Sequence, residues 1–157
     1  MAIRSGLARL EGVESISPRA DYKTATCDLR WKNGQFVAPP AFSNYVAQLS
    51  LGARMRGLEA TIDGSLRKEG SRILLQVGGT NIVLCLAPLR IKVQKDVPNK
   101  KPAQPTPIEA RAYKDLRAQW KGQTHAVRIT GPLVQKPGGA PVELEVRQFE
   151  LRPSAHR

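Results

Sequence analysis

Side chains that could act as nucleophiles, general bases or metal ligands are few and scattered in this sequence. The histidines are His125, at the start of a predicted strand, and His156, in the last residues. The cysteines Cys27 and Cys85 lie inside separate predicted strands, where a small buried hydrophobe is a commoner role than a disulfide or a metal ligand. No nucleophile turn, glycine-rich phosphate loop or acid–base carboxylate pair is recognisable. We therefore expect no catalytic residues, no metal site in the chain as written and no cofactor, and we predict that the protein is not an enzyme.

The net charge of +12 and the pI near 10.3 favour anionic partners such as nucleic acid, an acidic protein face or anionic lipid. The positive excess is spread evenly, because residues 1–58, 59–104 and 105–157 each carry a net charge of +4. An even spread favours an ordinary solvated surface over a dedicated nucleic-acid patch.

The hydropathy pattern predicts no membrane span, because no window of 18 apolar residues occurs. The N-terminus lacks the apolar stretch and cleavage pattern of a signal peptide. We expect a cytoplasmic chain as written, exported only if the true start lies upstream of Met1.

Residues 1–58 predict a small α+β module in the order helix, strand, strand, helix, strand. Ile3, Leu7 and Leu10 fall at helical spacing, and Pro39–Pro40 leads into a second helix. The expected elements are a helix at 3–10, strands at 13–17 and 22–31, a helix with Phe42, Tyr45, Val46 and Leu49 on one face, and a strand at 53–60.

The spacing of apolar residues and glycines in this module resembles that of a known family. The pattern Ile3-x3-Leu7-x2-Leu10-x-Gly12-Val13-x2-Ile16, then Thr-Ala-Thr-Cys-Asp-Leu at 24–29, then Leu49-x2-Gly52, resembles the heavy-metal-associated domain of copper chaperones and metal-transporting ATPases. The resemblance implies a ferredoxin-like fold that lacks its first strand. In that family a Cys-x-x-Cys pair grips one soft metal ion. Alignment places the second of those cysteines two residues before Met1, so a metal such as copper is expected only if the motif is encoded upstream.

A ferredoxin-like sheet without its first strand has unpaired inner edges. Three solutions are open: a start upstream of Met1 that restores the strand, a strand inserted by another chain, or a rearranged sheet in which the strand around Leu58 fills the gap. The second predicts a protein partner or self-association through the open sheet edge.

Residues 59–153 predict a β-barrel with the strand and helix order β-β-β-α-β-β of an OB-fold. The stretch Gly122-x2-His125-Ala126-Val127-Arg128-Ile129-Thr130-Gly131, then a glycine-rich turn and Leu144-Glu145-Val146, resembles the last hairpin of small bacterial OB-fold proteins, which implies a binding module. The expected elements are strands at 58–66, 72–77 and 82–86, a further strand at 90–94, a Pro- and Lys-rich linker at 95–107, a helix at 108–120, a strand at 125–134 broken at Gly131–Pro132, a strand at 142–151 and a tail at 154–157.

The helix at 108–120 has its own start signal and buried stripe. Thr106 stands in N-cap position with Glu109 three residues on, the spacing of a capping box. Ala112, Leu116 and Trp120 recur at helical spacing, so this face is predicted to be buried.

A basic OB-fold suggests binding of single-stranded nucleic acid, but the strands from Arg72 to Val93 contain no Phe, Tyr or Trp on which bases could stack. Arg72, Arg90 and Lys92 are the candidate contacts to phosphates or nucleic acid. The leading hypothesis is a non-enzymatic two-module binding protein with a docking or metal-handling role. The alternative is a basic OB-fold protein that binds single-stranded nucleic acid or phosphates non-specifically.

Overall fold

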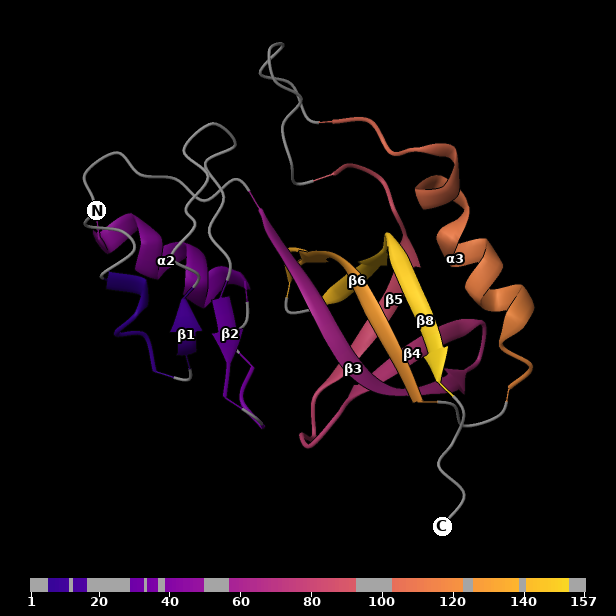
Figure 1. Ribbon diagram of the computed structural model, residues 1–157, viewed down its shortest axis with the longest axis horizontal. Coiled ribbons are helices and arrows are strands. Elements are labelled where there is room, and N and C mark those ends of the chain that lie inside the picture. Colours follow the sequence, from indigo (N-terminus) through magenta and orange to yellow (C-terminus); the bar gives the residue numbers. More distant parts are fainter. Residues whose placement is uncertain are drawn as a thin grey trace.

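The computed structural model describes residues 6–11, 13–16, 29–32, 34–36, 39–49, 57–92, 103–122, 126–138 and 141–152. These residues form an α+β structure whose elements are β1 (Val13–Ile16), β2 (Leu29–Trp31), α2 (Pro39–Leu49), β3 (Leu58–Glu69), β4 (Arg72–Val77), β5 (Val83–Pro88), α3 (Pro107–Gln119), β6 (Ala126–Val134), β7 (Glu143–Val146) and β8 (Gln148–Arg152). Helix α3 lies along one side of a barrel, and α2 lies with β1 and β2 beyond β3 on the other side (Figure 1).

The barrel is closed by five strands in the order β3-β4-β5-β7-β6, with β6 pairing back to β3. Strands β5 and β7 run parallel, and the other neighbours run antiparallel. Helix α3 connects the third strand of the barrel to the fourth. This connectivity is compatible with the predicted OB-fold, in which a partly open barrel is formed from five such strands.

Strand β3 closes the barrel because it pairs with two different strands along its length. Residues 58–65 pair with β6, whereas residues 64–69 pair with β4. A Cβ atom on Gly64 would lie 2.2 Å from the carbonyl oxygen of Gln76. Glycine is therefore required where the two pairings overlap, since any side chain would push β4 away.

A second close approach lies at Gly131 in β6, where a Cβ atom would lie only 1.6 Å from the carbonyl oxygen of Glu145. The predicted strand break at Gly131–Pro132 is wrong, because β6 continues through both residues to Val134. The glycine does not interrupt β6. It allows β7 to pass closer than a side chain would permit.

The interruption falls instead on the opposing strand, at Arg147. Thr130 pairs with Gln148 and Leu133 with Leu144, so three residues of the last strand oppose two of β6. The extra residue is a β-bulge, and the Arg147 amide donates to the Thr130 carbonyl at 3.0 Å. The single predicted strand at 142–151 is thus divided into β7 and β8.

The barrel interior is filled by alternate residues of each strand and by one face of α3. The predicted stripe of Ala112, Leu116 and Trp120 is confirmed, with 4%, 0% and 7% of each residue exposed. The largest fully buried side chains are Leu75, Leu84, Leu116, Ile129, Leu144, Val127 and Val146.

The segment after β5 differs from its prediction. Strand β5 runs to Pro88. The prediction of a further strand is wrong for residues 90–92, which are not in a strand. Residues 93 and 94 of that predicted strand lie outside the described residues. Cys85 in β5 is a half-buried free thiol, and Cys27 also lies outside the described part of the chain.

In the first module, β1 and β2 pair antiparallel, and Phe42 and Val46, two of the residues predicted to share one face of the helix, are buried. Trp31 packs edge-to-face on Phe42, with ring centroids 6.1 Å apart. The strand around Leu58 pairs with β6 in the barrel, and within the described residues β1 and β2 pair only with each other. The ferredoxin-like arrangement stays a prediction, since residues 17–28 and 50–56 lie outside the description.

The loop after β2 contacts the barrel. Phe36 packs against the barrel core, and a Cβ atom on Gly34 would lie 3.5 Å from the Gly79 carbonyl oxygen. These contacts join the first module to the turn between β4 and β5.

We expect Gly131→Ala to destabilise the barrel by about 3 kcal/mol or more, because the added methyl must displace the β7 backbone. Urea unfolding of the full chain measures this change. Ser65→Ala, on neighbouring β3, is the control and should stay within about 0.5 kcal/mol of the parent. Equal stability of the two variants would contradict the close approach.

Candidate functional site

The outer face of β4, β5 and β7 includes the two strands with which OB-folds bind ligands. Leu74, Cys85 and Glu143 stand next to one another across it. Leu74 is buried, although it faces away from the barrel interior. Arg72 and Gln76 of β4, Val83 and Ala87 of β5, and Glu145 of β7 complete the face.

The two carboxylates of this face are bound by basic side chains. Glu145, only 3% exposed, accepts from the backbone amide of Arg90 at 2.9 Å and from its Nε at 2.6 Å. Glu143 accepts from Arg90 Nη2 at 2.7 Å and from Lys136 Nζ at 2.6 Å. Burial alone would raise the pKa of Glu143, but the hydrogen bonds from Lys136 and Arg90 lower it.

A second ionic cluster surrounds Glu109 at the start of α3. The predicted capping box is confirmed: the Thr106 hydroxyl accepts from the Glu109 amide, and the Glu109 carboxylate accepts from the Thr106 amide at 2.8 Å. Lys92 Nζ lies 3.1 Å from that carboxylate and Arg147 Nη1 lies 3.2 Å from it. Burial would raise the pKa of Glu109, but the Thr106 amide, Lys92 and Arg147 together lower it to about 2.

Arg147 links this cluster to the first strand of the barrel. Its guanidinium binds Glu59 through both Nε and Nη2 while it also contacts Glu109. The side chain at the β-bulge therefore connects β3 with the start of α3. Because the carboxylates are largely buried, each would be costly without its partner. We interpret this cluster as structural.

The predicted anion contacts Arg72, Arg90 and Lys92 differ in their surroundings. Arg90 and Lys92 bind the carboxylates described above, and the Lys92 side chain is only 14% exposed. Arg72 is exposed at the start of β4, next to the turn from β3. Their binding of phosphates or nucleic acid stays a prediction.

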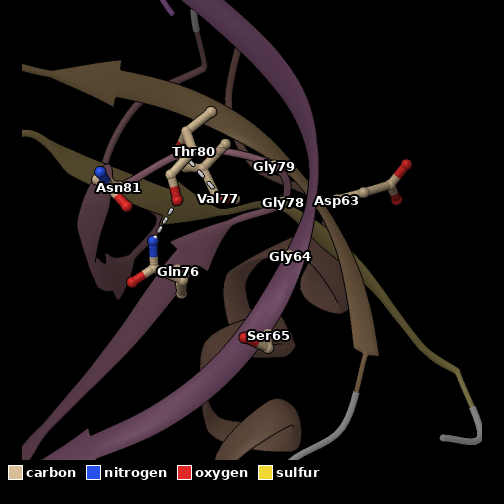
Figure 2. A pocket seen from close by; sticks show the side chains of 9 residues that line it. All are labelled: Asp63, Gly64, Ser65, Gln76, Val77, Gly78, Gly79, Thr80 and Asn81. Atoms are coloured by element: carbon tan, nitrogen blue, oxygen red, sulfur yellow. Dashed lines mark hydrogen bonds between the residues drawn. The ribbon is translucent and has the colours of Figure 1, made fainter. Parts of the chain in front are cut away.

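A cleft beside the β4–β5 turn is shown in Figure 2. Gln76 Nε2 donates to the carbonyl oxygens of Thr80 and Ile82 at 2.8 and 3.2 Å, so its amide is occupied within the turn. The Asp63 carboxylate points away from Gln76 and Thr80 and binds the Arg128 guanidinium through two hydrogen bonds. Because these polar groups already have partners, this cleft is a weak candidate for ligand binding.

A different cleft lies between the β3–β4 turn and the C-terminal end of α3. Lys68 and Ser71 come from the turn side, and Arg117 and Lys121 come from the helix side. Its other lining residues are Ile73, Trp120 and Gly122. Sequence reasoning missed this site. The i, i+4 spacing of Arg117 and Lys121 was visible, but nothing in the sequence placed Lys68 beside them.

The comparisons with known proteins assign no family. No protein-family model matches the chain, and no curated protein matches it. Among the described residues, no three His, Cys, Asp or Glu side chains gather in a way that could hold a metal ion. Within the same part of the chain, no helix is long and apolar enough to span a membrane.

The Glu109 cluster predicts acid sensitivity. The pKa of Glu109 falls from 4.5 to about 2 on folding, so its partners stabilise the fold above pH 4.5, and this stability is lost as the pH falls toward 2. Between pH 6 and pH 2.5, the free energy of unfolding should fall by about 2 kcal/mol more in the parent than in Glu109→Gln. Urea titrations at both pH values measure the difference.

The control is Glu69→Gln, which removes an exposed carboxylate at the end of β3. Its change in stability between the two pH values should match that of the parent within about 0.5 kcal/mol. If Glu109→Gln also matched the parent, the carboxylate would not be held by these ion pairs in solution.

Proposed function

We propose that this protein is a non-enzymatic binding protein whose OB-like barrel docks an anionic ligand or partner. The proposal rests on one observation: some basic residues of the barrel form ion pairs with carboxylates, and the others do not. Those that form the ion pairs above, such as Arg90 and Arg147, are neutralised by carboxylates. Among the described residues from 57 onward, which form the barrel and α3, the basic side chains without an ion pair lie on the β3–β4 hairpin and on α3 with the residues just after it.

Seven basic residues belong to this unpaired set, whereas the same regions carry two carboxylates without an ion pair, Glu69 and Asp115. A local positive excess of this size attracts anions and raises their rate of association. The basic residues are Arg67, Lys68, Arg72, Arg111, Lys114, Arg117 and Lys121.

Single-stranded nucleic acid is the second candidate, favoured by the same basic surface and by the OB-like connectivity. The outer face of β4 and β5 carries no aromatic side chain. Base stacking, worth about 1–3 kcal/mol for each base, is therefore missing there. We rank this function below docking of a smaller or non-nucleic anion.

Calorimetric titration of the full chain tests the function with three probes: inorganic triphosphate, an eight-residue glutamate peptide and an eight-nucleotide oligothymidylate. We expect saturable binding of at least one probe at 50 mM NaCl and weaker binding at 150 mM, because ion contacts are screened by salt. If none of the three bound at the lower salt concentration, the proposal would fail.

The sheet of β1 and β2 supports a separate contact, self-association through its open edge. Within the described residues it has only two strands, so each has one edge with unpaired backbone groups. We expect sedimentation velocity to show a concentration-dependent dimer that Arg30→Pro abolishes, since proline removes a backbone donor from β2. The control Arg30→Ala should still dimerise. A monomer at all concentrations would refute this contact.

A further inference from the structure

The cleft at the end of α3 gathers positive charge from two distant segments of the chain. Lys68 lies near the end of β3, whereas Arg117 and Lys121 lie about 50 residues later, on α3 and just after it. Its lining also includes Ile73 and Trp120, which are 4% and 7% exposed and belong to the barrel core. The cations therefore stand on a rigid part of the barrel.

The charge in this cleft is not balanced by the protein. None of the ion pairs among the described residues includes Lys68, Arg117 or Lys121. No Asp or Glu is among the residues that line the cleft, including the unpaired Glu69 and Asp115. The C-terminus of α3 contributes roughly half a negative charge, which leaves an excess of roughly two to three positive charges.

The lining groups are suited to a compact oxyanion with more than one negative charge. Lysine ammonium groups act as strong point charges, and a guanidinium can donate two parallel hydrogen bonds to one oxyanion. The Ser71 hydroxyl adds a neutral donor. The Arg117 guanidinium carbon lies 6.0 Å from the Tyr113 ring centroid, within the range of a cation–π contact that orients it.

The size and lining of the cleft distinguish among anions. Its volume of about 230 Å³ is below the roughly 300–1,000 Å³ of pockets that enclose whole drug-sized ligands. It therefore suits one charged group of a ligand. Trp120 is the one aromatic residue of the lining, and it is too buried to offer its ring face to a nucleobase. A phosphate group fits this arrangement better than a stacked nucleotide or a singly charged carboxylate.

We propose that the cleft between the β3–β4 turn and the end of α3 binds the phosphate group of a small phosphorylated compound. Lys68, Arg117 and Lys121 supply the charge, and Ser71 donates a hydrogen bond. This inference rests on the proposed function and names the site and ligand chemistry through which the barrel acts.

The test is calorimetric titration of the full chain with inorganic phosphate and with inorganic triphosphate at 150 mM NaCl. The cleft variant carries Lys68→Gln and Lys121→Gln. The matched control carries Arg9→Gln and Lys32→Gln, which remove the same charge from exposed positions of the first module that do not line the cleft. Urea unfolding of both variants verifies that they fold.

We expect the cleft variant to bind triphosphate about tenfold or more weakly than the parent, and the control to stay within about twofold. In ¹⁵N-labelled parent protein, triphosphate should shift the amide signals of Ser71 and Gly122 more than those of β1 and β2. Lys68→Arg, which keeps the charge, should bind within about threefold of the parent.

Three results would overturn the proposal. If the cleft variant and the control lost equal affinity for triphosphate, the overall positive charge of the protein, and not the cleft, would bind the anion. Binding of the glutamate peptide without binding of triphosphate would leave the proposed function standing and remove the phosphate site. Tighter binding of oligothymidylate than of triphosphate, lost in the cleft variant, would assign the cleft to a nucleic-acid backbone.

Discussion

Closure of the barrel depends on β3 holding two partners, β6 along its first part and β4 along its second. Two glycines make this geometry sterically accessible. Gly64 lets β3 turn against Gln76, and Gly131 lets β6 approach the backbone of Glu145. With the barrel closed, side chains of its strands and of α3 fill the interior, so a continuous apolar core forms around Leu75, Ile129 and similar residues.

The ionic clusters fix the elements that surround this core. Arg147 occupies the β-bulge and binds Glu59 from β3 and Glu109 from α3. The Glu109 carboxylate also caps its own helix and accepts from Lys92. Placing one carboxylate among several donors offsets the cost of burying it. The same pairing neutralises much of the positive charge of the barrel, and the remainder is concentrated on the β3–β4 hairpin and α3.

The two modules contribute different surfaces. The barrel presents a basic cleft formed by Lys68, Arg117 and Lys121, whereas the first module presents a short two-stranded sheet. Contacts of Gly34 and Phe36 join the first module to the barrel beside the β4–β5 turn. The cleft lies elsewhere, between the β3–β4 turn and the end of α3.

Local patterns in the sequence were enough to predict the strand and helix order of the barrel, the bounds of β4, the capping box at Thr106 and the buried stripe of α3. These depend on alternation, helical spacing and short-range hydrogen bonds, all of which are read within a few residues. The sequence predicted an interruption at Gly131 in β6, whereas the opposing strand is interrupted at Arg147. Gly131 is needed because the backbone of β7, a later strand, passes close to it, and a local pattern does not reveal this contact. The sequence also suggested Arg90 and Lys92 as anion contacts, although the fold pairs them with Glu145 and Glu109. Only tertiary structure decides which charges meet, because ion pairing depends on distances between side chains that are far apart in sequence.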